Sequence, residues 1–158
     1  MFKPEHKLAC WLIGFIVAFG SCDMTKGKKK FPDTPDYKLS HPKILRLPPE
    51  LDEISGIVYY PKDTSVFAIT DEDGLLYKIS LKDPRKIRQW TFDKKRDYED
   101  LVLIDSTFYV LISKGDILTL KFINDSIQTE KSDFSDAGKT TMEFESLLVV
   151  DDSTLMMI

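Results

Sequence analysis

Glu53-Ile-Ser-Gly-Ile-Val-Tyr59 is the first of three similar stretches, and Glu99-Asp-Leu-Val-Leu-Ile104 and Glu145-Ser-Leu-Leu-Val-Val150 follow it. The glutamates that open these stretches stand 46 residues apart both times. Each glutamate precedes a run of β-branched and other apolar residues, which favours a strand. A period in the forties, with one such strand at the start of each unit, indicates a repeat architecture with the three glutamates at equivalent positions.

Each unit continues with further strand-like runs separated by turn residues. Strands are expected at residues 54–60, 65–70, 75–81 and 87–92 of the first unit, and at 101–104, 107–113, 116–122 and 126–130 of the second. Four short antiparallel strands per unit are typical of a propeller blade. We therefore predict an all-β chain that forms part of a β-propeller, with blade one at 53–97, blade two at 98–144 and a partial third blade at 145–158.

The turns of the three units also repeat, as Asp63-Thr-Ser65, Asp105-Ser-Thr107 and Asp152-Ser-Thr154, but their offsets are not identical. The order of elements is therefore a firmer guide than the equal spacing. The last strand-like run is Leu155–Ile158, so we expect about two and a half blades and the N-terminal fragment of a longer product. Ile44–Leu47 is expected to be the outer strand of a last blade in the complete ring.

The first 22 residues have the pattern of an export signal, with two lysines, an apolar run at Leu8–Phe19 and Gly20-Ser21 before Cys22. That run is short for a bilayer core of about 30 Å. The small-small-Cys ending resembles a bacterial lipobox, so Cys22 is predicted to carry a lipid that anchors the protein to an envelope membrane. Ordinary secretion with cleavage nearby is the alternative. Cys10 and Cys22 are the only cysteines, so no disulfide is expected within residues 23–158.

Residues 23–43 are expected to be a flexible linker to a domain at 44–158. The linker holds the Lys26–Lys30 run and two prolines, Pro32 and Pro35, a composition that favours disordered or extended chain. Its lysines could contact anionic lipid head groups beside the anchor. A solvated spacer is the favoured interpretation.

Charge and residue types exclude some functions. The net charge is −4, and residues 23–158 carry 20 basic and 25 acidic side chains, which argues against nucleic acid. The two histidines, His6 and His41, both precede the first repeat unit. No Ser–His–Asp set can therefore form within residues 48–158, and no Cys or His cluster is present there for zinc. The sequence thus leans away from an enzyme.

Glu53, Glu99 and Glu145 are the candidate metal ligands. We expect each to stand at the mouth of the innermost strand of its blade. Carboxylates that converge raise one another's pKa or recruit a cation, and calcium is the natural hard cation for oxygen ligands. The alternative is that each glutamate accepts backbone N–H groups of the neighbouring blade and locks the blades together.

Two charged segments have weaker signals. Asp71-Glu-Asp-Gly74 contains part of a calcium-loop pattern, but Asp-Gly is also a common tight-turn signal, and the turn is favoured. Asp93–Asp97 is expected to be a solvated loop.

Three strings resemble the SdiA-regulated (YjiK-like) family of bacterial envelope proteins. They are Leu51-Asp-Glu-Ile-Ser-Gly-Ile57, Val66-Phe-Ala-Ile-Thr-Asp-Glu-Asp-Gly-Leu-Leu-Tyr77 and Asp97-Tyr-Glu-Asp-Leu101. The resemblance implies a six-bladed propeller that is exported, often lipid-anchored and linked to calcium. The plan is also similar to lactonase and strictosidine-synthase-like propellers, in which a glutamate at this position can ligate calcium.

The sequence therefore predicts a lipid-anchored binding module of the cell envelope for a protein, glycan or small molecule, with calcium as the candidate cofactor. One alternative is a calcium-dependent hydrolase of the lactonase or esterase type, with Glu53 as a metal ligand. The other is a truncated product without function.

Overall fold

A computed structural model describes residues 32–135 and 142–158, and it divides the chain into two units at residues 1–43 and 44–158. The predicted signal peptide, with Cys22, and the Lys26–Lys30 run lie outside the described residues. No helix in the described part of the chain is long and apolar enough to cross a membrane.

The described end of the first unit contains a hydrogen-bonded loop. The Asp33 carboxylate accepts from the backbone N–H of Ser40 at 2.8 Å and from its hydroxyl at 3.0 Å. Between them, the N–H of Thr34 donates to the carbonyl of Tyr37 at 2.9 Å. Short-range side-chain acceptors of this kind close turns that composition alone does not specify.

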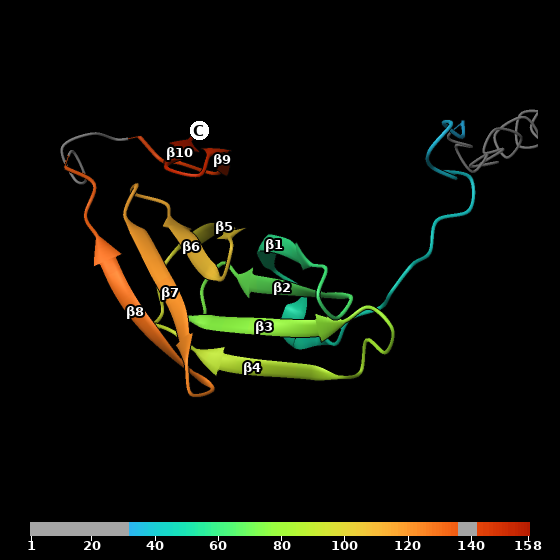
Figure 1. Ribbon diagram of the computed structural model, residues 1–158, viewed down its shortest axis with the longest axis horizontal. Helices are drawn as coiled ribbons and strands as arrows, with labels where there is room; N and C mark the ends of the chain where they lie inside the picture. Colours follow the sequence, from blue (N-terminus) through green and yellow to red (C-terminus); the bar gives the residue numbers. More distant parts are fainter. Residues whose placement is uncertain (1–31, 136–141) are drawn as a thin grey trace, which may run out of the picture. The chain divides into compact units, whose positions relative to one another are not determined.

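The second unit is all-β and antiparallel, in two four-stranded sheets and a hairpin (Figure 1). Each large sheet is a meander in which strands that follow one another in sequence pair side by side. The first sheet contains β1 (Ile54–Tyr60), β2 (Ser65–Thr70), β3 (Leu75–Ser80) and β4 (Ile87–Thr91). The second contains β5 (Tyr98–Ile104), β6 (Thr107–Ile112), β7 (Ile117–Ile123) and β8 (Ser126–Ser132), and the hairpin contains β9 (Leu147–Asp151) and β10 (Thr154–Met157).

Tight turns with left-handed backbone join several of these strands. Asp105 begins the two-residue β5–β6 connection with φ of 56°, and Asn124 and Asp125 form the β7–β8 connection with φ of 48° and 64°. Asn and Asp tolerate this conformation better than most residues, and positive φ at both central positions matches the twist of a hairpin. These residues therefore fix the register of the second sheet.

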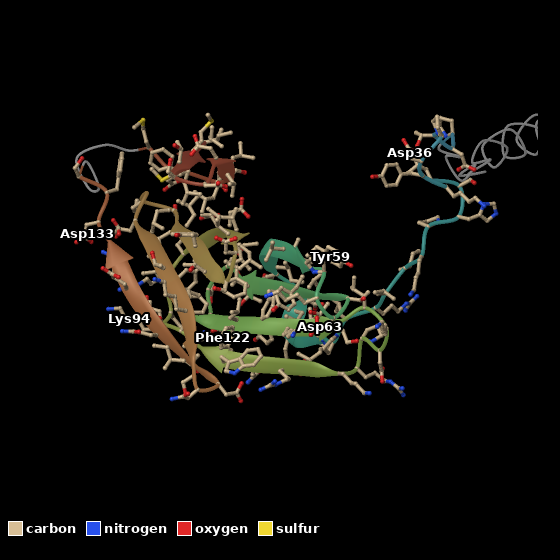
Figure 2. All side chains as sticks on the ribbon, in the orientation of Figure 1. Asp36, Tyr59, Asp63, Lys94, Phe122 and Asp133 are labelled. Atoms are coloured by element: carbon tan, nitrogen blue, oxygen red, sulfur yellow. The ribbon has the colours of Figure 1, made fainter. Side chains whose placement is uncertain are left out.

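The main core lies between the two large sheets. Inward residues of both sheets form one buried cluster, which includes Phe67, Leu76, Tyr98, Phe108 and Leu120. The ring centroids of Phe67 and Phe108 are 4.7 Å apart, so an aromatic contact joins β2 to β6. Figure 2 shows Phe122 of β7 at the junction of the two sheets. Neither sheet could bury its apolar face without the other.

The opposite face of the first sheet packs on the segment that precedes it. A 3-10 helix, η2 (Pro49–Leu51), places Leu51 against Ala68, Tyr77 and Ile79. Ile44–Leu47 is not paired with a strand in the described residues, although its sequence predicts one. Leu47 instead packs on this second cluster.

The first strands of successive sheets lie side by side, with β1 against β5 and β5 against β9. Gly56 of β1 is buried against β5. A Cβ atom added there would lie 2.6 Å from the backbone nitrogen of Leu101 and 2.8 Å from its Cβ. Only glycine fits at this position because the obstacle is largely backbone.

A bulge in these first strands sets the true correspondence between the sheets. The extra residue is Ser55 in β1 and Glu99 in β5, since the register shifts between Ile54 and Gly56 and between Tyr98 and Asp100. The carbonyls of Glu53 and Asp97 both accept from the residue that follows the second strand, Asp71 and Ser113 respectively. Glu53 therefore corresponds to Asp97, and Ser55 corresponds to Glu99.

The predicted equivalence of all three glutamates is thus wrong for Glu53. The β1–β2 loop is longer than the two-residue β5–β6 loop, and this difference shifts the first unit against the others. Glu145 does correspond to Glu99, because Leu147 and Leu101 are the matching buried residues of β9 and β5. An equal spacing in sequence therefore gives an equal position in only two of the three units.

Candidate functional site

The site is the acidic end of β5, where it meets the segment that leads into β9. Glu99 is half-buried in the bulge of β5, whereas Glu145 is exposed two residues before β9. Glu99 lies close enough to Glu145 and Asp97 for their negative charges to interact. The structure therefore brings two of the three predicted glutamates together. No carboxylate contact to them is recorded for Glu53, the exposed residue before β1.

The electrostatics of this carboxylate pair are unusual. Burial raises the pKa of Glu99 to about 7, and the negative charges of Glu145 and Asp97 contribute to the same shift. Carboxylates that lie close together repel each other when both are ionised, which favours a proton on one of them. Near neutral pH this site can hold a proton or exchange it for a cation.

Asp100 is the residue that joins the second sheet to the β9–β10 hairpin. One of its oxygens accepts from the backbone N–H of Leu101 at 2.7 Å, and the other accepts from that of Leu147 at 2.8 Å. The alternative interpretation of the sequence expected carboxylates to accept backbone N–H groups of a neighbouring unit, but it assigned this role to the glutamates. Asp100 performs this role because the bulge turns it, instead of Glu99, toward the next strand.

Asp97 and Asp100 were not predicted to be site residues from the sequence. The signal that could have found them is the run of three acidic residues around Tyr98, at the start of an otherwise apolar strand. Charge at such a place opposes strand burial, and therefore indicates a specific partner for each carboxylate.

The charged segment Asp93–Asp97 is more fixed than a solvated loop. Asp93 accepts from the guanidinium of Arg96 at 2.6 Å and from the hydroxyl of Tyr98 at 3.2 Å. Burial alone would raise the pKa of Asp93, but the backbone N–H of Lys94, followed by Arg96 and Tyr98, lowers it overall. The N–H groups of Arg96 and Tyr98 donate to the carbonyls of Glu72 and Asp71 at 3.1 and 2.6 Å. This segment thereby ties the start of β5 to the first sheet.

Asp71–Gly74 connects β2 to β3, and two of its carboxylates form ion pairs. Lys95 lies 3.0 Å from the Asp73 carboxylate and 3.9 Å from that of Glu72. The carbonyl of Gly74 accepts from the N–H of Phe92 at 2.8 Å. These contacts support the turn interpretation of this segment.

A cation at the acidic end of β5 would have few preformed ligands. No group of three or more His, Cys, Asp or Glu side chains is arranged to hold a metal within residues 32–135 and 142–158. Asp97, Glu99 and Glu145 are close enough to interact, but they do not converge as ligands. Calcium takes six to eight oxygens. The pair Glu99–Glu145 has the right donor chemistry and could supply about four of them.

Replacement of Glu99 by glutamine is expected to change how stability depends on pH. The pKa is 4.5 for an ordinary glutamate and about 7 here, so the folded protein holds this proton more tightly than the unfolded chain. For this group, the free energy of unfolding is highest below pH 4.5 and falls as the pH rises to 7. In Glu99→Gln, the free energy of unfolding should therefore fall by about 1–2 kcal/mol less over this pH range than in the unsubstituted protein, after allowance for solvent screening.

Urea unfolding between pH 4.5 and 8 measures this difference. Glu130→Gln on β8 is the matched control, because Glu130 is exposed and far from the pair in sequence. Parallel pH profiles for Glu99→Gln and the unsubstituted protein would contradict the raised pKa of Glu99.

Neither a scan against protein-family models nor a search of curated proteins finds a match to this chain.

Proposed function

We propose that the two large sheets are adjacent blades of a β-propeller and that the β9–β10 hairpin begins a third. Three observations support this proposal. Each sheet is a four-stranded meander, the sheets pack face to face, and their first strands β1, β5 and β9 are neighbours. First strands of this kind line the axis of a propeller. The six-bladed form comes from the family resemblance alone.

The function that we infer is binding, with a cation held at the inner ends of the strands. The observation that carries this inference is the proximity of Glu99, in the bulge of β5, to Glu145, at the matching position just before β9. A divalent cation would replace the proton held by Glu99 and relieve the repulsion between the two carboxylates. Glu99 and Glu145 would hold calcium directly, and Asp97 would add charge beside it. A bound cation can then orient the anionic or hydroxyl groups of a ligand.

Calorimetric titration with calcium tests this function. We expect calcium binding to give a measurable heat and to release protons, since Glu99 must ionise to act as a ligand. The apparent affinity should rise at least tenfold between pH 6 and 8 and disappear in Glu99→Gln. Glu53→Gln is the control that should bind as before. The proposed site would be overturned if Glu53→Gln failed to bind calcium, or if Glu99→Gln bound calcium as well as the unsubstituted protein.

The place where the protein acts is proposed from Cys22. Lipid attachment there would hold the domain at a bacterial envelope membrane through the segment up to residue 43. Metabolic labelling with radioactive palmitate should mark the unsubstituted protein and not Cys22→Ala, while Cys10→Ala should alter labelling little. Equal labelling of both variants would contradict the anchor.

A further inference from the structure

A second candidate site lies on the face of the first sheet that packs toward the second sheet. Alternate residues of a strand point to the same face, so the strand register identifies the side chains on it. Leu76 is paired with Trp90 in one row of this face, where both contribute to the main core. The next row pairs Lys78 with Arg88. The face therefore changes from apolar to cationic toward the β1–β2 turn.

A groove of about 240 Å³ opens over the cationic part of this face. Its lining consists of six polar residues, which are Asp63, Ser65, Lys78, Ser80, Lys86 and Arg88. Lys86 immediately precedes β4, and its carbonyl accepts from the N–H of Ser80 on β3 at 3.3 Å. Three cationic side chains thus meet on one face of the sheet, in what we call the cationic groove.

The charges of the cationic groove are only partly compensated. Like charges directly opposite each other in a sheet have Cβ atoms about 5 Å apart and are destabilising, and Lys78 and Arg88 form such a pair. Asp63 pairs with Lys78, and Asp125 of the β7–β8 turn accepts from Arg88 with both oxygens at 2.8 Å. Within the described residues, no carboxylate lies at ion-pair distance from Lys86. One positive charge therefore remains in excess.

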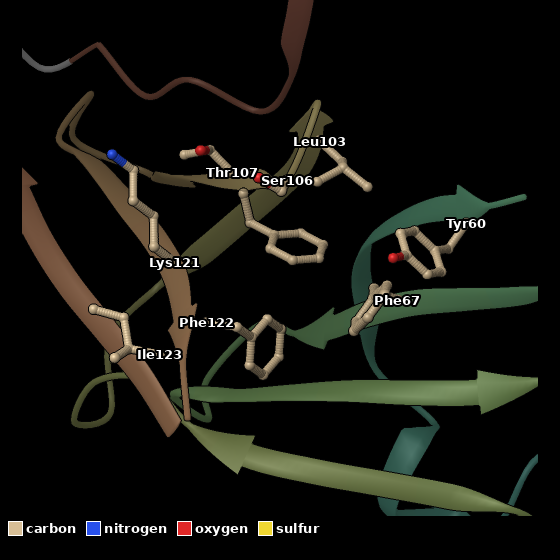
Figure 3. A pocket seen from close by; sticks show the side chains of 9 residues that line it. Tyr60, Phe67, Leu103, Ser106, Thr107, Lys121, Phe122 and Ile123 are labelled. Atoms are coloured by element: carbon tan, nitrogen blue, oxygen red, sulfur yellow. The ribbon is translucent and has the colours of Figure 1, made fainter. Parts of the chain in front are cut away.

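Aromatic rings hold two of these cations in place. The ammonium group of Lys78 lies 4.9 Å from the ring centroid of Tyr60 and 5.3 Å from that of Phe67. The guanidinium of Arg88 lies 4.7 Å from the ring centroid of Trp90. Figure 3 shows Tyr60 beside Phe67, on the side of the first sheet. Cations that are already positioned in this way lose less side-chain entropy when they bind an anion.

Donors and size define the class of ligand. Lysine and arginine are the side chains that recognise phosphate oxygens. The hydroxyl of Ser80 accepts from the N–H of Asp83 at 3.3 Å, so its own proton can be donated to a ligand. The volume lies below the 300–1,000 Å³ of drug-sized sites, which favours a small ligand. Every lining residue is polar, so none of them would insert into a lipid bilayer.

We propose that the cationic groove binds the dianionic phosphate group of a small, water-soluble phosphate monoester. Lys86 and Arg88 donate to its oxygens, and the phosphate competes with Asp63 for Lys78. The cationic groove shares no residue with the cation site at Glu99, so either proposal can fail without the other.

Titration with glycerol 3-phosphate, followed by the fluorescence of Trp90, tests this site. A full-length Trp11→Phe background leaves Trp90 as the sole tryptophan, and the guanidinium of Arg88 over its ring makes it sensitive to a bound anion. Sodium chloride keeps the ionic strength constant, so that general screening does not change during the titration. We expect a saturable change in fluorescence, and none with glycerol, which lacks the phosphate.

Three variants locate the phosphate. Lys86→Gln should weaken binding about fivefold. Asp63→Asn should strengthen binding about fivefold, because it removes the carboxylate that competes for Lys78. Lys82→Gln is the matched control, since Lys82 is an exposed residue of the same β3–β4 connection that does not line the groove. It should leave the affinity unchanged. Near-ultraviolet circular dichroism of each variant confirms that it is folded.

The absence of a saturable change with glycerol 3-phosphate would overturn the proposal. Equal affinities of Lys86→Gln and Lys82→Gln would overturn the placement of the phosphate, as would a folded Asp63→Asn variant that binds no more tightly than the unsubstituted protein. Binding to vesicles that contain phosphatidate, without binding of glycerol 3-phosphate, would overturn the choice of a water-soluble ligand.

Discussion

Tyr98→Ala should lower the free energy of unfolding by about 3–5 kcal/mol, the largest loss that we expect from one side chain in this domain. Tyr98 is fully buried at the start of β5, and its ring packs on Phe92 with centroids 5.1 Å apart. Its hydroxyl donates to the carbonyl of Lys94 at 2.5 Å. Truncation would leave a cavity between the sheets and release the loop that leads into β5.

The conservative variant separates the ring from the hydroxyl. Tyr98→Phe keeps the packing and leaves the Lys94 carbonyl without this donor, so its cost should be about 1–2 kcal/mol. Tyr59→Ala is the control, since that tyrosine is 53% exposed on β1. Urea denaturation of the three variants measures the differences. A loss in Tyr98→Ala no larger than that in Tyr59→Ala would show that this core does not hold the sheets together.

Gly56→Val should cost about 3 kcal/mol or more, because the new side chain would have to displace backbone. The carbon that it adds would meet the backbone nitrogen of Leu101 at 2.6 Å and the carbonyl carbon of Asp100 at 2.9 Å. β1 and β5 would be forced apart, and the change would reach the hydrogen bonds that Asp100 accepts.

Thermal unfolding followed by circular dichroism measures this effect. Ile57→Val is the matched control, as Ile57 is the next residue in β1 and is 54% exposed. It should change stability by less than about 0.5 kcal/mol. If Gly56→Val melted at the temperature of this control, the close approach of the two strands would be wrong.

Much of the strand order follows from local patterns. β1 and β2 have the predicted bounds, 54–60 and 65–70, because Pro61–Thr64 interrupts two runs of strand-forming residues. β5 begins three residues earlier than predicted, at Tyr98. Its acidic residues seemed unsuited to a strand, but hydrogen bonds from neighbouring segments compensate their charge. A single sequence does not reveal those partners.

Other features depend on contacts distant in sequence. Ile44–Leu47 has a strand-like composition, yet a strand requires a neighbour that accepts and donates its hydrogen bonds. The role of Asp100 depends on a bulge, which adds one residue and reverses the side chains that follow it. Such an insertion is invisible when strands are aligned by their first glutamate. The carboxylate contact was predicted for Glu99 and Glu145 but not for Asp97.

The unequal β1–β2 and β5–β6 loops have a consequence for anyone who would exchange one sheet for another. A transplant cut at Glu53 and Glu99 would add or delete two residues at the seam and shift the inner strand by two positions. Cuts at Glu53 and Asp97 keep the seam continuous, because their carbonyls accept equivalent hydrogen bonds from the backbone N–H groups of Asp71 and Ser113. The positions at which sheets of this chain could be exchanged are thus set by these backbone hydrogen bonds. Equal spacing in the sequence would place the cuts wrongly.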